Sequence, residues 1–148
     1  CSSDLDPENV GALIRIGAAF GAAAIVLGPG SADPFSRRVL RVSMGNGLFL
    51  PIVQASDLTA QLMELQQAHA MQLCLTLLDP TAQPLHQYPF APRTVLVFGN
   101  EYDGISSVVQ QLPGPRLTIP MLNSTDSLNV AVSAGIFLHQ YRSLIPAG

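Results

Sequence analysis

Short apolar runs that alternate with helix-like patterns are the feature of this sequence that most limits its fold. The runs at 72–78 (QLCLTLL) and 94–98 (TVLVF) are hydrophobic at nearly every position rather than at every second one. A strand that is apolar on both faces is typical of a parallel sheet covered by helices on both sides. Because helical segments separate these runs, the sequence predicts an α/β fold with a largely parallel sheet flanked by helices.

The ends of the helices can also be predicted. Asp6 before Pro7 is a favourable helix start, and the apolar spacing carries that helix to about residue 20. Ser56 is expected to cap a second amphipathic helix. The last helix should cover 127–144 and is apolar nearly all round, which indicates burial on two sides, one of them against a partner subunit. The remaining expected elements are strands at 23–27, 48–53 and 116–119, short helices at 35–42 and 106–112, and a proline-rich linker at 79–92.

Composition narrows the class of protein. A chain of 148 residues fits one domain, and 48% hydrophobic residues suffice for a core. The longest apolar stretch is too short to cross a bilayer, and the first ten residues are polar and acidic, unlike a signal peptide. Cys1 and Cys74 have the spacing of neither a disulfide framework nor a metal site. We therefore expect a cytoplasmic protein that binds no metal and does not associate with a membrane.

The charge balance weighs against nucleic-acid binding. The net charge is −3, the isoelectric point is about 5.4, and the chain has no lysine. Domains that bind nucleic acids are usually basic, because neutralising phosphates dominates their affinity. However, Arg37, Arg38 and Arg41 lie within five positions. These three arginines could form a local RNA-binding patch, and a solvated helix face explains them equally well.

Three segments carry the functional signal. Residues 6–15 read DPENVGALIR, 96–105 read LVFGNEYDGI, and 119–130 read IPMLNSTDSLNV. In this order they resemble the three motifs of the SpoU (TrmH-like) family of SPOUT RNA 2'-O-methyltransferases. The first is similar to the family's N-x-G-x-x-x-R, the second to its G-x-E-x-x-G, and the third to its I-P-M followed by S-L-N-V. Each motif alone is weak, whereas all three in order are specific, and they span almost the whole chain.

The resemblance has two departures. Asn123 stands where the family often has glycine, and asparagine tolerates the left-handed backbone best among the other residues. Relatives also carry a strand just before the first motif and often a separate RNA-binding domain. We therefore expect 1–148 to be a single catalytic domain that lacks a preceding strand or domain.

The resemblance implies a fold, a reaction and an assembly. The fold would be an α/β domain with a C-terminal trefoil knot. The reaction would transfer a methyl group from S-adenosyl-L-methionine to a ribose 2'-hydroxyl of tRNA or rRNA. The chain would form a homodimer whose active site draws on both subunits.

The family's donor-binding positions match Gly99, Ile119 and Leu128, and Met121 lies close by. Gly99 ends a strand and would let a ligand approach the backbone. Ile119 and Leu128 could hold a flat adenine between them. Taken one at a time, these residues are explained as well by a glycine turn and by core aliphatic residues.

Arg15 matches the catalytic arginine of the family. Its neighbours one turn away on either side are glycine or alanine, which leaves room for a substrate. Arginine is effectively never deprotonated in proteins, so we expect Arg15 to grip phosphate and stabilise a developing alkoxide rather than to act as a base. Asn9 and Asn129 could orient Arg15 or the substrate, and Glu101 could hold a loop amide or pair with Arg15. Ser127 is the fourth supporting residue of the site and could also cap the last helix.

Two other functions compete with this interpretation. A SPOUT-like RNA-binding protein without transfer activity would have no need of Arg15, Glu101 and Asn129. A dinucleotide-binding Rossmann domain is poorly supported, because no G-x-G-x-x-G joins a first strand to a helix.

Overall fold

The computed structural model describes residues 5–79, 81–100, 102–122 and 127–145. Strands and helices alternate along the chain, as the sequence predicts. In order, the elements are α1 (Pro7–Ala19), β1 (Ile25–Leu27), α2 (Arg37–Val42), η1 (Asn46–Leu48), β2 (Ile52–Gln54), α3 (Leu58–Gln67), β3 (Gln72–Thr76), β4 (Gln83–Pro84), η2 (Leu85–Gln87), β5 (Thr94–Val97), α4 (Ser107–Gln110), β6 (Arg116–Thr118) and α5 (Val130–Leu144).

All strand pairs of the described sheets are parallel. Four strands form a sheet in the order β4-β6-β3-β5, and β1 pairs with β2. The central strand β3 places Leu75 opposite Val97 of β5 and Arg116 of β6. The expectation of a largely parallel sheet is confirmed, in the form of two separate hydrogen-bonded sheets.

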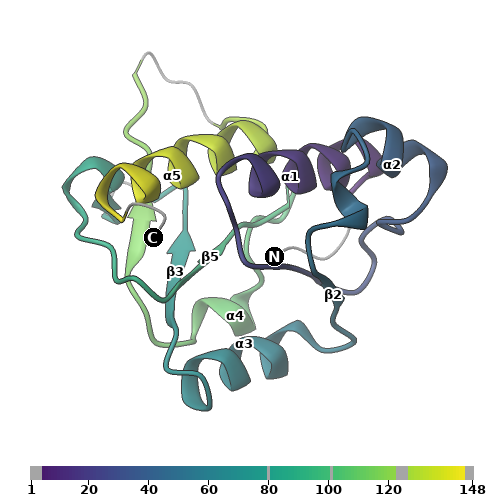
Figure 1. The fold of residues 1–148 in the computed structure, drawn as a ribbon. Coiled ribbons are helices and arrows are strands. Elements are labelled where there is room, and N and C mark those ends of the chain that lie inside the picture. Colours follow the sequence, from purple (N-terminus) through teal and green to yellow (C-terminus); the bar gives the residue numbers. More distant parts are fainter. Residues whose placement is uncertain (1–4, 80, 101, 123–126, 146–148) are drawn as a thin grey trace.

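Helices cover both faces of the strands. α1, α2 and α5 lie on one side, and α3 and α4 lie on the other (Figure 1). β3 shows why its sequence is apolar throughout. Leu73 and Leu75 pack in one core with Leu62 of α3, whereas Cys74 packs in the other core with α1 and α5. Successive side chains of a strand point to opposite faces, so both faces need apolar residues.

Side-chain caps fix the starts of the helices. Asp6 accepts a hydrogen bond from the Asn9 amide at 2.7 Å and caps α1, as expected. Two other expected caps are wrong. Asp57, not Ser56, caps α3, and α5 begins at Val130 because Asn129, not Ser127, accepts hydrogen bonds from its first amides.

Two expectations around proline are corrected. The expected strand at 48–53 begins only after Pro51, which has no N–H to give to a ladder. The expected linker at 79–92 contains β4 and η2 and buries Tyr88 and Phe90, whose rings meet edge to face with centroids 5.0 Å apart. Pro84 fits in β4 because that strand lies at the sheet edge and pairs with β6 alone among the described strands.

Cys74 is a core residue. Burial raises the pKa of its thiol to about 11, although a hydrogen bond with Tyr88 lowers it in part. The thiol is therefore protonated at neutral pH, and it packs as a small apolar side chain rather than as a nucleophile.

Two further expectations concern the chain as a whole. A trefoil knot would involve the segment 123–126, which lies outside the described residues, so the knot stays an expectation from the resemblance. Among the helices that the structure describes, none is both long and apolar enough to span a membrane.

Candidate functional site

A cavity of about 320 Å³ opens at the carboxyl ends of β3, β5 and β6. The carboxyl ends of parallel strands meet at one edge of a sheet, where ligands of α/β proteins commonly bind. Its walls come from the segments 76–79, 98–100 and 103–105, from residues just after β6, and from the start of α5. The cavity therefore takes its walls from the second and third motifs, which follow β5 and β6.

The four expected donor-binding residues all line this cavity. Gly99 follows β5, whereas Ile119, Met121 and Leu128 follow β6, and each of the four is half-buried. Ser127 also lines it, with an exposed side chain. Motifs that are far apart in the sequence thus contribute to one cavity of the size that holds small molecules.

Gly99 is required by the loop itself. A Cβ at this position would lie 2.2 Å from the carbonyl carbon of Gly104 and 2.4 Å from the amide nitrogen of Ile105. No real side chain fits at such distances from backbone atoms. The sequence argument explained Gly99 by the approach of a ligand to its backbone. The structure shows that the backbone of Gly104 and Ile105 lies against this glycine.

The loop after Gly99 closes on itself. Asn100 and Gly104 exchange backbone hydrogen bonds of 3.2 Å, and the Asn100 side-chain oxygen accepts from the Tyr102 and Asp103 amides at 3.0 and 2.6 Å. Gly104 has φ +67°, which favours glycine. The second motif therefore forms a tight wall of the cavity. Glu101 belongs to this motif but lies outside the described residues.

Two carboxylates of the cavity wall were not among the site residues predicted from the sequence. Asp79 and Asp103 both line the cavity. The amide and hydroxyl of Thr81 donate to Asp79 at 2.8 and 2.7 Å and hold the pKa of its carboxyl below the usual range. Asp79 is therefore ionised at neutral pH. Its position just after β3 was the available signal, because it stands at the same sheet edge.

Asn9 and Asn129 contact each other. The Asn129 side-chain nitrogen donates to the Asn9 side-chain oxygen at 2.9 Å, and the Asn129 oxygen accepts from the Ala131 amide at 2.9 Å. This pair joins the first and third motifs and holds the start of α1 against the start of α5. The role of this pair in orienting Arg15 or the substrate stays a prediction.

Arg15 lies apart from the cavity of its own chain. It is six residues after Asn9, so it is about 9 Å further along α1 and faces away from that side chain. Asn9 is buried, whereas Arg15 is exposed and is not part of the cavity lining. Within the described residues, no group forms a hydrogen bond or ion pair with the Arg15 guanidinium.

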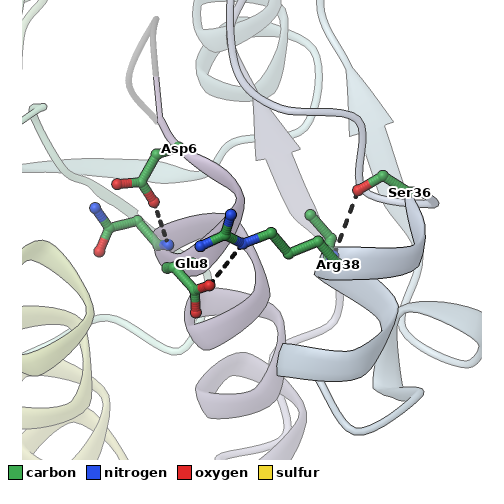
Figure 2. A network of polar contacts seen from close by, with 6 residues as sticks. Asp6, Glu8, Ser36 and Arg38 are labelled. Carbon is green, nitrogen blue, oxygen red and sulfur yellow. Dashed lines mark hydrogen bonds and ion pairs between the residues drawn. The ribbon is translucent and has the colours of Figure 1, made fainter.

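The three clustered arginines all lie on α2 and are exposed. Figure 2 shows Arg38 reaching across to Glu8 of α1, where its Nε donates to a carboxylate oxygen at 2.7 Å. Both side chains are more than half exposed, so this ion pair is worth little stability. The guanidinium groups of Arg37 and Arg41 have no hydrogen-bond or ionic partner in the part of the chain that the structure describes.

A second hollow runs along the outer face of α5. This groove of about 430 Å³ is lined by Val132, Gly135 and Ile136 of α5, together with Leu85 and Pro120. Val132 is 51% exposed and Ile136 38% exposed, although α5 buries its other face in the core. The single chain therefore covers one apolar side of α5 and leaves the second uncovered.

The described residues show no group of three or more His, Cys, Asp or Glu side chains that could hold a metal ion.

The comparisons with known proteins agree with the three motifs. The family model of the SpoU rRNA Methylase family matches residues 4–139. An uncharacterized tRNA/rRNA methyltransferase of Synechocystis is 36% identical over 93% of the chain and 49% of its own length. The 23S rRNA (guanosine(2553)-2'-O)-methyltransferase RlmP of Bacillus subtilis is 34% identical over 93% of the chain and 54% of its own length.

The solved structures agree as well. The SpoU methyltransferase AviRb of Streptomyces viridochromogenes, in complex with AdoMet, superposes with a TM-score of 0.85 at 28% identity, over 94% of this chain and 56% of that one. The chain spans about half the length of the curated relatives it matches. Because the match covers all three motifs and nearly every element, the chain belongs to the SpoU rRNA Methylase family.

Proposed function

We propose that this chain transfers a methyl group from S-adenosyl-L-methionine to a ribose 2'-hydroxyl of RNA, either tRNA or rRNA. The observation that carries the proposal is the shared cavity: Gly99, Ile119, Met121 and Leu128 meet at the carboxyl edge of the sheet. The relatives named above support it, since their names describe ribose 2'-O-methylation of rRNA and binding of AdoMet.

The cavity fits such a donor chemically. Ile119 and Leu128 offer apolar surface for adenine, and the backbone of the loop after Gly99 offers polar groups for its edge. The carboxylates of Asp79 and Asp103 suit a ligand that carries a sulfonium and an ammonium group. The donor brings an already activated methyl group, so the protein's task is to align the acceptor and to exclude water.

Arg15 would act on the acceptor. Its guanidinium can hold a phosphate of the RNA through two parallel hydrogen bonds and stabilise the negative charge that develops on the ribose oxygen. Asn129 and Asn9 would position the loop before α5, and Ser127 offers a hydroxyl at the cavity wall. We retain Glu101 as a supporting residue on the strength of the motif.

The site would be completed by a second copy of the chain. Arg15 is exposed and lies away from the cavity of its own chain, so a homodimer is the simplest way to bring an arginine to it. The uncovered groove along α5 offers a surface for that contact. A symmetric dimer would then contain two composite sites.

Incubation with methyl-labelled donor and RNA tests the activity. We expect label to appear in RNA as a 2'-O-methylated nucleotide, and we expect calorimetry to give the same donor affinity with and without a chelator. Donor binding without transfer to tRNA or rRNA would point to an RNA-binding protein that has lost the reaction. Loss of donor affinity on adding chelator would show that a metal takes part.

A charged residue on the uncovered face of α5 tests whether the chain forms a dimer through this helix. We expect the parent chain to sediment at about twice 15.7 kDa, and Ile136→Asp to sediment as a monomer, since an unpaired charge would be buried at the interface. The monomer should still bind the donor but should transfer no methyl group. Val108→Asp is the matched control, because Val108 is exposed on the opposite layer in α4. A monomeric parent chain with full transfer activity would contradict the composite site.

A further inference from the structure

The segment 35–49, which contains α2 and η1, exposes both cationic and apolar side chains. Its large apolar side chains that are more than half exposed are Phe35, Met44, Leu48 and Phe49. Phe49 is 85% exposed, whereas the core residue Phe137 is 2% exposed. Three of the seven arginines of the chain lie in the same segment. Soluble proteins rarely leave this many large apolar side chains together on the surface without a use for them.

The segment is compact, so these side chains belong to one region. The Gly45 amide donates to the Leu40 carbonyl at 2.9 Å, which folds the chain back onto α2. A Cβ at Gly47 would lie 3.6 Å from the Pro34 carbonyl oxygen and 3.7 Å from a Leu40 methyl carbon. η1 therefore packs against α2 and against the residue just before Phe35.

Met44 has a backbone conformation that glycine adopts at lower energy. Met44 has φ +55° and is followed by Gly45 with φ +75°. A left-handed backbone is unfavourable for methionine and free of cost for glycine. The thioether is nevertheless 69% exposed and is not needed for the core. Met44 is therefore held at the surface of the segment by a backbone turn and not by packing in the core.

The same region adjoins Arg15. A Cβ at Gly11 would lie 2.6 Å from the Cβ of Val42, so the end of α2 packs directly on Gly11. Arg15 follows Gly11 by four residues and is its neighbour on the helix surface. Arg15 lies seven positions after Glu8, the partner of Arg38, which also puts these two positions on one face of α1. Arg15 therefore lies on the same side of α1 as the contacts with α2.

We propose that the segment 35–49 binds unpaired nucleotides of the RNA, with Phe35 and Phe49 stacking on bases and Arg37 and Arg41 contacting phosphates. This inference rests on the proposed RNA substrate and adds that the RNA is single-stranded where it meets α2. Aromatic side chains stack on any exposed base, whereas the bases of a duplex already stack on one another. The guanidinium groups of Arg37 and Arg41, which have no partner among the described residues, supply the positive charge that a phosphate backbone needs in a chain of net charge −3.

Equilibrium binding without donor tests the inference on the whole chain. The probes are a short single-stranded RNA, the duplex formed with its complement, and an abasic strand of equal length. We expect the single strand to bind most tightly. Phe49→Ala should weaken its binding roughly tenfold, to the level of the abasic strand. Phe49→Trp should restore binding, and Phe49→Leu should not, because leucine keeps apolar surface but has no aromatic face. Val108→Ala is the control for an exposed apolar side chain elsewhere.

The salt dependence separates stacking from charge. The double variant Arg37→Gln/Arg41→Gln should lower the slope of log affinity against log salt by roughly 1.4, and Phe49→Ala should leave that slope unchanged. Equal binding of single strand and duplex, or full binding by Phe49→Ala, would overturn the inference. Full binding by Phe49→Leu would also overturn it, because stacking needs an aromatic face, and a changed oligomeric state in Phe49→Ala would instead identify an apolar protein interface. Because no donor is present, these results do not depend on whether the chain transfers methyl groups.

Discussion

Replacing Arg15 by alanine should lower methyl transfer by roughly a hundredfold or more, while donor affinity stays within a factor of about two. The guanidinium is expected to meet the acceptor and the developing charge, and it does not line the donor cavity of its own chain. Arg15→Lys should recover little activity, because a point charge does not replace a planar fork with two parallel hydrogen bonds. Single-turnover transfer assays and donor calorimetry measure the two effects separately. Near-normal transfer by the lysine variant would show that two parallel hydrogen bonds from residue 15 are not needed.

Mixing two inactive variants tests where Arg15 acts. Leu128→Asp should abolish donor binding, because it puts a charge on an apolar wall of the cavity. In a mixed dimer of Arg15→Ala with Leu128→Asp, one composite site would contain an intact cavity and an intact arginine. Random exchange of subunits should then restore about a quarter of the parent activity. If each chain used its own arginine, the mixture would stay as inactive as its parts.

Gly99→Ala should abolish measurable donor binding and lower the free energy of unfolding by about 1–3 kcal/mol. The added methyl group would meet the backbone of Gly104 and Ile105 at 2.2 and 2.4 Å, and backbone cannot rotate away as a side chain can. The loop after β5 would have to move, and this loop is a wall of the cavity. Calorimetry gives the donor affinity, and chemical denaturation gives the stability.

Gly114→Ala is the matched control for the loss of donor binding in Gly99→Ala. A Cβ at Gly114 would lie 2.2 Å from the Leu73 carbonyl oxygen, which is an equally severe clash with backbone. Gly114 precedes β6 and does not line the cavity. This variant should lose comparable stability but should bind the donor normally in its folded fraction. Normal donor binding by Gly99→Ala would separate the second motif from the donor site.

Local sequence determined most of the fold. The run at 72–78 predicted a strand buried on both faces, and β3 has Leu73 and Leu75 in one core with Cys74 in the other. The cap at Asp6 was predictable because it needs only a carboxylate and an amide three residues later. The caps of α3 and α5 were harder, since several capping residues stand near each start and tertiary packing decides which one is used.

Segments that depend on distant partners could not be predicted in this way. The proline-rich stretch 79–92 looked like a linker, yet β4 pairs with β6, and Phe90 packs edge to face on Tyr141 of α5 at 5.5 Å. Neither contact leaves a local pattern in the stretch itself, because the partners lie far along the chain.

The candidate site also has features that follow from local sequence and features that depend on distant contacts. The sequence alone determined the three motifs and their order, because residue type is a local property. Only the tertiary structure decided that the four residues expected to bind the donor share one cavity with Asp79, and that Gly99 is needed for the approach of Gly104. It also placed Arg15 on the exposed side of α1, away from that cavity. A helix position sets which way a side chain points, but the packing of α1 on α2 and α5 sets what that side chain can reach.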